Sequence, residues 1–169
     1  HYDKALAFLQ VARDKDPNDA DPYVKMGMIH ASRGQHEEAL KMYRKVMELD
    51  PQDASIHNVM GYIYDKQGEM ERALEEYNKA RELNPEDALI LDNLGNLYYK
   101  LGRFEKAQEE FQELIRLNPQ HVDALSKLGN IYLKMGDKPK AVAHWEKALE
   151  LDASNEILKN NLKIVRGGV

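Results

Sequence analysis

The segment LDNLGNLYYKLGRFEKAQEEFQELIRLNP, residues 91–119, decides the fold because it contains one complete pattern of a helical hairpin. In its first part, an apolar residue or a glycine recurs at i, i+3, i+4 and i+7, which is the spacing of one helical face. The residues at these positions are Leu91, Leu94, Gly95 and Tyr98. Gly102 is predicted to end this helix, because glycine readily adopts the left-handed conformation of a C-terminal cap.

A second amphipathic helix is predicted from about Phe104 to Leu117. Its inward face consists of Ala107, Phe111, Leu114 and Ile115. The dipeptide Asn118-Pro119 ends it, because proline disfavours helical geometry at the residue that precedes it. Each of the two helices has only about 13 residues, which is too few to be stable alone in water, so the helices must pack on one another.

The same pattern recurs every 34 residues, so the sequence predicts an array of repeats with a core that continues from one hairpin to the next. The residues that keep this spacing are Gly27, Gly61, Gly95 and Gly129; Gly34, Gly68, Gly102 and Gly136; Pro17, Pro51, Pro85 and Pro119; and Ala5, Ala39, Ala73, Ala107 and Ala141. Small residues such as Gly95 and Ala107 are expected where the two helices of a hairpin cross. One repeated position holds Tyr43, Tyr77, Phe111 and Trp145, which are expected to fill the space between neighbouring hairpins.

The pattern resembles the tetratricopeptide repeat (TPR) family, whose motif has an aromatic residue, Leu-Gly, Tyr, Ala, Phe and Pro at fixed offsets. The copy that matches best reads Leu91, Leu94-Gly95, Tyr98, Ala107, Phe111 and Pro119. The resemblance covers nearly the whole chain. It implies an all-α fold, a right-handed α-solenoid of 34-residue helix-turn-helix repeats, in which the first helix of each hairpin lines a concave groove.

The period divides the chain into four full repeats with a partial repeat at each end. We expect the second helix of an incomplete repeat at residues 1–19, repeats at 20–53, 54–87, 88–121 and 122–155, and a C-terminal capping helix and tail at 156–169. In the capping helix, Lys163 stands where the other first helices have glycine, which fits a helix without a second helix to approach it.

The helix at the N-terminal end is expected to lack its hairpin partner and to expose an apolar stripe. The stripe consists of Ala5, Phe8, Leu9 and Ala12. We therefore expect that the natural chain extends further in the N-terminal direction, or that another copy covers the stripe by self-association.

Counting around the first helices from their packed positions gives a set of candidate groove residues for a protein or peptide ligand. This set is Met28, Asn58, Tyr62, Lys66, Asn93, Asn96, Tyr99, Lys100, Lys127, Asn130 and Lys134. Asparagine amides both donate and accept hydrogen bonds, so they suit the backbone of an extended peptide. Lys66, Lys100 and Lys134 recur at 34 residues and have two interpretations: attraction of an acidic ligand, or solvated cations that favour a helix C-terminus.

Composition excludes several functional classes. The net charge of −5 argues against nucleic acid as the main partner. Without cysteine there is no disulfide, thiolate nucleophile or Cys-based zinc site, and no two of the six histidines have the i, i+4 spacing of a helical metal site. No apolar stretch reaches the roughly 18 residues of a membrane-spanning helix, so no direct membrane insertion is expected. The glycines belong to hairpins or the tail and form no phosphate loop.

The sequence therefore predicts a protein-interaction scaffold or adaptor that is not an enzyme and carries no cofactor or metal. Two alternatives remain: a substrate-recruiting TPR arm of a larger enzyme, and a self-assembling structural scaffold of a bacterial assembly. We expect a cytoplasmic location, with any N-terminal targeting segment missing from a chain that starts at His1.

Overall fold

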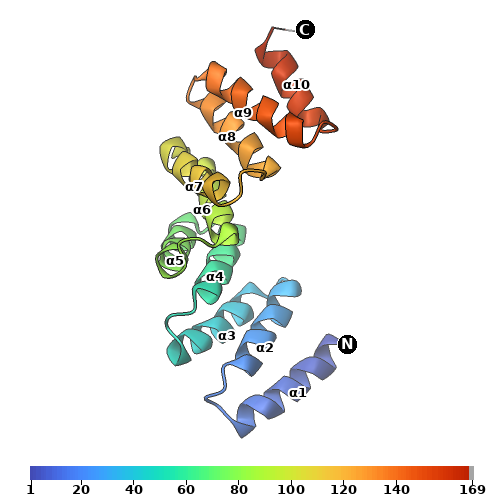
Figure 1. The fold of residues 1–169 in the computed structure, drawn as a ribbon. Helices are drawn as coiled ribbons and strands as arrows, with labels where there is room; N and C mark the ends of the chain where they lie inside the picture. The colour runs from blue at the N-terminus through green and yellow to red at the C-terminus, as the bar shows by residue number, and fades with distance from the viewer. Residues whose placement is uncertain (168–169) are drawn as a thin grey trace. The chain divides into compact units, whose positions relative to one another are not determined.

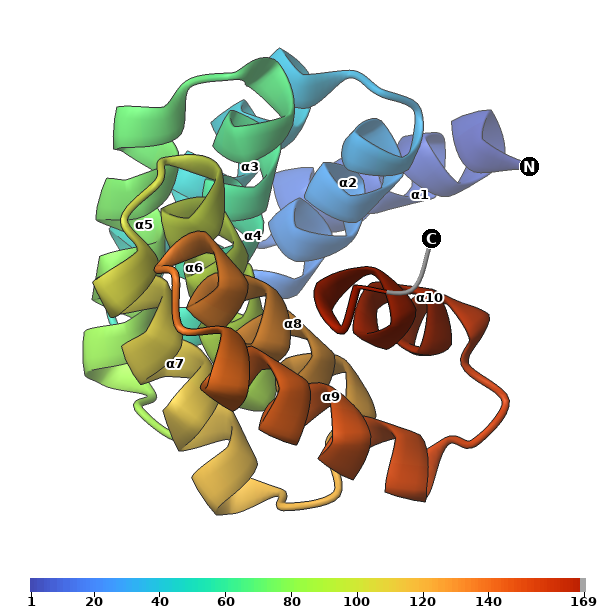
Figure 2. The same ribbon diagram turned by 90° about the horizontal axis from the view of Figure 1, so that it is seen from above.

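The computed structural model describes residues 1–167, which form two compact units that divide between Asn84 and Pro85. All regular secondary structure in these residues is α-helical (Figures 1 and 2). Residues 168–169, the end of the predicted tail, lie outside the described part of the chain.

The N-terminal unit, which we call unit 1, contains five helices within residues 1–84. They are α1 (Tyr2–Lys15), α2 (Asp21–Ser32), α3 (His36–Leu49), α4 (Ala54–Gln67) and α5 (Met70–Leu83). Helices α2 and α3 form one hairpin and α4 and α5 form the next, while α1 packs on α2 and α3 packs on α4. Each helix therefore packs mainly on its neighbours in the sequence (Figure 1).

The C-terminal unit, unit 2, also contains two hairpins and one further helix, which here follows the hairpins. Its helices are α6 (Ala88–Lys100), α7 (Phe104–Leu117), α8 (Val122–Lys134), α9 (Lys138–Leu151) and α10 (Glu156–Val165). Hairpins α6–α7 and α8–α9 pack through α7 and α8, and α10 packs on α9 (Figure 2). The second helix that the sequence predicts from Phe104 to Leu117 is α7, with the same bounds.

The repeated glycine of each first helix accommodates the aromatic ring of the second helix in the same hairpin. A Cβ added at Gly95 would lie 2.9 Å from Cζ of Phe111, and one at Gly61 would lie 2.7 Å from Cδ1 of Tyr77. Both distances are below van der Waals contact, so only glycine fits without displacing the ring. The sequence placed these aromatic residues between neighbouring hairpins, whereas the structure also seats each ring within its own hairpin, on the glycine.

The second helices bring alanine and the aromatic ring to the core side by side. Ala107 and Phe111 are one helical turn apart and are 0% and 1% exposed. Ala73 and Tyr77, at the same places of the preceding repeat, are also fully buried. The small methyl group of alanine lets the two helices of a hairpin approach closely, and the large ring fills the space beside it. This explains why alanine and an aromatic residue recur at these two positions in each repeat.

The first and second helices of a hairpin end in different ways. Gly102 ends the first helix of its hairpin with a φ of +70°, a left-handed conformation that favours glycine, as the sequence predicts. The second helix α7 ends at Asn118, whose extended backbone precedes Pro119. Asp152 has the same extended conformation before Ala153, so the break does not require proline.

The first helices α4, α6 and α8 and the capping helix α10 begin at side-chain caps, whereas α2 begins at Ala20 without one. Asp87 accepts hydrogen bonds from the backbone N–H groups of Leu89 (2.8 Å) and Ile90 (3.2 Å) at the start of α6. Asp53 does the same for α4, and His121 and Asn155 each accept one such bond at α8 and α10. These caps satisfy backbone donors that have no partner inside the helix, so they fix where these four helices start.

Candidate ligand-binding pocket

Unit 2 contains a pocket of about 210 Å³ that helices α6, α7 and α8 form together. Its lining residues are Asn96, Tyr99, Phe111, Lys127 and Asn130. Four of these five are residues that the sequence proposed for a groove, and the fifth, Phe111, was expected only to pack in the core. We call this site the α6–α8 pocket.

The helical register explains how these side chains meet. Asn96 and Tyr99 are three residues apart on α6, and Lys127 and Asn130 are three residues apart on α8, so each pair lies on one helical face. Phe111 of α7 also lines the pocket, and its ring, which is only 1% exposed, is packed below the other lining side chains. The pocket therefore has an apolar interior and amide groups from two helices.

Lys127 is held in place by two carboxylates. Its Nζ donates to Oδ1 of Asp92 and to Oδ2 of Asp123, both at 2.7 Å, and lies 5.3 Å from the ring centroid of Phe111. Burial lowers the pKa of Lys127, but the hydrogen bonds to Asp123 and Asp92 outweigh burial, and the net pKa is raised above the ordinary lysine value. Lys127 is thus a charged residue already compensated within the chain.

Asp92 links this ion pair to the pocket. Its Oδ2 accepts a hydrogen bond of 2.9 Å from Nδ2 of Asn96, while its Oδ1 accepts from Lys127. The amide nitrogen of Asn96 is therefore turned toward Asp92, which leaves its carbonyl oxygen as the group that can accept a bond from a ligand.

The amide of Asn130 makes no hydrogen bond within residues 1–167, and the side chain is half-buried. Tyr99 packs edge-on against Phe104, with ring centroids 5.5 Å apart, so one ring of the wall is fixed by its neighbour. Asn130 consequently offers both a donor and an acceptor next to a rigid apolar surface.

The remaining candidates of unit 2 lie outside this pocket. Asn93 is half-buried on α6, and Lys100 and Lys134 are exposed at the C-terminal ends of α6 and α8. Their positions agree with the interpretation that they are solvated cations beside the negative C-terminal ends of helices. Attraction of an acidic ligand stays a prediction.

The candidates of unit 1 have different environments. Met28 is 60% exposed and Tyr62 is 48% exposed, with the Nζ of Lys66 5.1 Å from the Tyr62 ring centroid. Asn58 is only 5% exposed, in contrast to the groove surface on which helical counting placed it. The side chain offers almost no surface to a ligand, because it is turned into the packed layer of the unit.

The stripe on the N-terminal helix is only partly exposed. Phe8 is 74% exposed and Ala5 is exposed, but Leu9 is 9% exposed and Ala12 is half-buried. Ala5, Phe8 and Leu9 line an open apolar cavity of about 440 Å³ with Met28 and Ile29 of α2. The exposed stripe is therefore narrower than the sequence predicts, because α2 covers part of it.

Sequence reasoning did not anticipate a buried pair in unit 1. Nδ1 of His57 lies 2.6 Å from Oε2 of Glu76, and both side chains are mostly buried. The partner of His57 lies 19 positions away on α5. The amphipathic pattern could not reveal this contact, since glutamate at position 76 looks like one more surface carboxylate.

The described residues contain no group of three or more His, Cys, Asp or Glu side chains that could hold a metal ion. Within residues 1–167, no helix combines the length and apolarity that crossing a membrane requires. The α6–α8 pocket itself contains two amides, a compensated lysine and two aromatic rings.

Consecutive helical hairpins, glycine–aromatic packing and a pocket of binding groups define a helical-repeat protein of the interaction-scaffold class. Models described as TPR repeat match residues 27–68, 61–102 and 95–136, and one described as Tetratricopeptide repeat matches residues 122–155. The chain belongs to the tetratricopeptide repeat family, and the predicted fold class is confirmed.

Solved structures of this family are similar over most of the chain. MamA from Desulfovibrio magneticus RS-1 is 26% identical with a TM-score of 0.81, and the match covers 92% of this chain and 88% of MamA. PilF of Pseudomonas aeruginosa is 28% identical with a TM-score of 0.74, covering 91% of this chain and 69% of PilF. YrrB, described as a TPR protein with an unusual peptide-binding site, is 23% identical with a TM-score of 0.83, covering 96% and 84%, and shares the fold. No curated protein matches the chain significantly.

Proposed function

We propose that this protein is a non-catalytic scaffold that binds a peptide or protein segment, and that the α6–α8 pocket is a binding site for it. The observation that carries this proposal is the free amide of Asn130 beside an apolar pocket of about 210 Å³. A volume of this size can hold one apolar side chain of a ligand, and the adjoining asparagine amides can form hydrogen bonds with the ligand backbone.

The chemistry of the pocket favours a peptide with an apolar residue over a simple anion. Tyr99 supplies apolar surface, which gains free energy when it is removed from water, beside the already buried ring of Phe111. The charge of Lys127 is already opposed by Asp92 and Asp123, so an added carboxylate would meet a local excess of negative charge. We therefore expect a neutral or weakly basic ligand segment at this site.

The hydrogen bonds of such a ligand follow from the two asparagines. Asn130 can donate to a ligand carbonyl and accept from a ligand N–H, as a β-strand neighbour does. Asn96 can accept through its carbonyl oxygen, because its nitrogen is engaged by Asp92. The pair would bind the main chain of an extended segment, while the pocket selects one side chain.

Self-association of the chain is a second candidate function, which the exposed apolar cavity on α1 and α2 favours. Phe8 and Met28 are 74% and 60% exposed, and together they form an apolar patch of the kind that marks interaction sites. Light scattering over a concentration series tests it: a mass that rises with concentration in the native chain, and less so in Phe8→Ser, supports it. A constant monomer mass contradicts it. The role of a substrate-recruiting arm stays a prediction.

The experiment for the peptide proposal starts from a random peptide library displayed on phage and selected on the intact chain. Enriched peptides are synthesised, and their affinities are measured by titration calorimetry for the native chain and for Asn130→Ala. We expect a loss of about tenfold, which corresponds to the removal of one or two net hydrogen bonds.

Asn160→Ala is the matched control, because Asn160 is an exposed asparagine on α10, away from the pocket lining. Its affinity should equal that of the native chain. Equal affinities for all three proteins, or selected peptides without an apolar residue in common, would show that the ligand binds elsewhere.

A further inference from the structure

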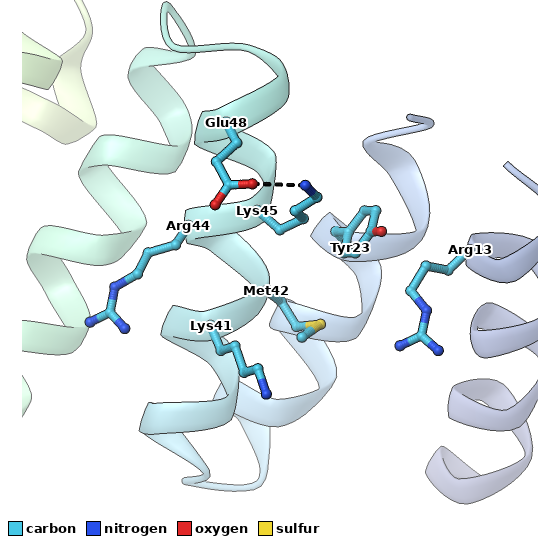
Figure 3. A pocket seen from close by; sticks show the side chains of 7 residues that line it. All are labelled: Arg13, Tyr23, Lys41, Met42, Arg44, Lys45 and Glu48. Carbon is cyan, nitrogen blue, oxygen red and sulfur yellow. Dashed lines mark hydrogen bonds and ion pairs between the residues drawn. The ribbon is translucent and has the colours of Figure 1, made fainter. Parts of the chain in front are cut away.

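A second pocket lies in unit 1 along the outer face of α3, with Tyr23 of α2 and Arg13 of α1 on one side and Arg44 turned to the other side (Figure 3). It has a volume of about 460 Å³, and four cationic side chains line it. They are Arg13 of α1 and Lys41, Arg44 and Lys45 of α3. We call it the α3 basic pocket. None of the groove candidates belongs to it.

Two of the four cations have carboxylate partners. Nζ of Lys45 lies 2.7 Å from Oε2 of Glu48, and Nη2 of Arg13 lies 2.8 Å from Oδ1 of Asp14. Figure 3 shows Lys45 turned toward Glu48 and away from Lys41. The Asp14 side chain is 68% exposed, and exposed pairs of this kind are worth only about 0–1 kcal/mol, so a ligand carboxylate can replace Asp14 beside Arg13.

The other two cations are not compensated by an acid. Arg44 donates a hydrogen bond of 3.1 Å to the hydroxyl of Tyr64, which is a neutral group. Lys41 has neither an ion pair nor a hydrogen bond within residues 1–167. Four cations against two carboxylates leave a local charge of +2, in a chain whose net charge is −5. This excess attracts anions to one place on an otherwise acidic protein.

The other repeats provide an internal comparison for these positions. At intervals of 34 residues, position 41 corresponds to Glu75, Glu109 and Ala143, and position 44 corresponds to Asn78, Gln112 and Glu146. The same helix packing is therefore built without cations, and even with glutamate, in three other hairpins. At the position of Arg44, Gln112 donates the equivalent hydrogen bond of 3.1 Å to the hydroxyl of Tyr132, so the fold uses a donor at this place but does not require a positive charge. The positive charges of Lys41 and Arg44 are therefore available for a ligand.

The wall between the cations is apolar. Tyr23 is 7% exposed, and its hydroxyl donates a hydrogen bond of 3.3 Å to the carbonyl of Pro17, so the edge of its ring forms a fixed surface. Met42 is half-buried beside it and extends into the space between α3 and α2 (Figure 3). A flexible thioether next to a fixed ring suits an aliphatic side chain of a ligand.

The same wall disfavours single-stranded nucleic acid. Binding of unpaired bases relies on exposed aromatic faces on which the bases stack. The one aromatic ring among the residues that line this pocket is the buried Tyr23. A ligand that combines carboxylates with an apolar residue therefore fits the observed surface better than a phosphate backbone with bases.

We propose that the α3 basic pocket binds an acidic polypeptide segment, with carboxylates at Lys41 and Arg13 and an apolar side chain against Tyr23 and Met42. Arg44, on the other flank of α3, adds positive charge for a segment that crosses this helix. This site is separate from the α6–α8 pocket, and it prefers an acidic segment, whereas the α6–α8 pocket prefers a neutral or weakly basic one. The protein would then hold two different polypeptide segments, one in each unit.

The test uses the full chain and two fluorescein-labelled 12-residue peptides, one repeating Glu-Glu-Leu and one repeating Lys-Lys-Leu. Fluorescence anisotropy measures their affinities for the native chain and for Lys41→Glu/Arg44→Glu. Both substitutions place residues that other repeats carry at the same positions, so the variant should fold, which circular dichroism checks. We expect the acidic peptide to bind about tenfold more weakly to the variant and to weaken as salt is raised.

The control is Lys147→Glu/Lys163→Glu, which changes the net charge of the chain by the same amount on exposed residues of unit 2. It should bind the acidic peptide within about twofold of the native chain, because screening limits the effect of distant charges. Equal affinities of the native chain and the α3 variant would overturn the proposal. A basic peptide that loses as much affinity in the α3 variant as the acidic peptide does would overturn it too. So would a labelled 12-nucleotide single strand that binds the native chain more tightly than the acidic peptide and loses that affinity in the α3 variant. None of these results bears on the α6–α8 pocket.

Discussion

The indole ring of Trp145 lies so close to Gly129 that a Cβ added to this glycine would overlap Nε1 and Cδ1 of the ring. Nε1 also donates a hydrogen bond of 3.2 Å to the carbonyl of Ser126 on the same helix as the glycine. The largest aromatic residue of the repeated position is thus fixed by both contact and hydrogen bond to its own hairpin.

We therefore expect Gly129→Ala to be the most damaging of the four equivalent substitutions. It should lower the free energy of unfolding by about 1–3 kcal/mol, the usual cost of forcing extra atoms into a packed core. Gly95→Ala should cost less, since the added Cβ would lie 2.9 Å from the Phe111 ring. Urea unfolding followed by circular dichroism compares the variants. A double variant with Trp145→Leu should recover part of the loss of Gly129→Ala, and no recovery would contradict the explanation.

The cap of α6 gives a second prediction. Asp87→Ala removes the acceptor for the N–H groups of Leu89 and Ile90, and should destabilise the protein by about 1 kcal/mol. Asp87→Asn keeps an acceptor oxygen and should retain most of this stability. Hydrogen exchange at the first turn of α6 is the measurement. Equal exchange rates in both variants would show that the side-chain bonds contribute little.

The buried phenol of Tyr43 should make the stability of the protein depend on pH in the alkaline range. Burial raises the pKa of Tyr43 to about 12 from the usual 10.0. Between these values the unfolded chain releases the phenol proton and the folded chain keeps it, so the free energy of unfolding falls as pH rises. The slope from this group is about 1.4 kcal/mol per pH unit.

Tyr43→Phe removes this contribution. Relative to the variant, the native chain should lose stability as the pH is raised from 10 to 12, and the difference between the two should be constant below pH 9. Denaturant unfolding at a series of pH values measures it. A difference that does not change with pH would mean that Tyr43 ionises normally in the folded protein.

Asp92 connects Lys127 to Asn96, and this predicts coupled effects on ligand binding. If the proposed peptide ligand binds the α6–α8 pocket, Asp92→Ala should weaken it about as much as Asn96→Ala, because the amide of Asn96 loses its orientation. The double variant should then lose little more than either single variant. A double-mutant cycle by calorimetry measures this, and additive losses would separate the two residues.

Much of the fold could be read from the 34-residue period. Gly102 and Asn118-Pro119 predicted helix ends that the structure confirms, since glycine readily adopts the left-handed conformation of a cap and proline disfavours helical geometry at the residue before it. The groove candidates were predicted less completely. Asn96, Tyr99, Lys127 and Asn130 come together in one pocket, but Asn58 is buried.

The sequence by itself determined the repeat, its helices, its turns and the family, because these depend on residues close together in the chain. Only the tertiary structure decided which polar groups are paired: Lys127 with Asp92, 35 residues away, and His57 with Glu76, 19 residues away. It also left Asn130 and Lys41 without partners in the described residues. Pairing depends on side chains that meet across helices, and a helical period specifies the face of a residue but not the group opposite it.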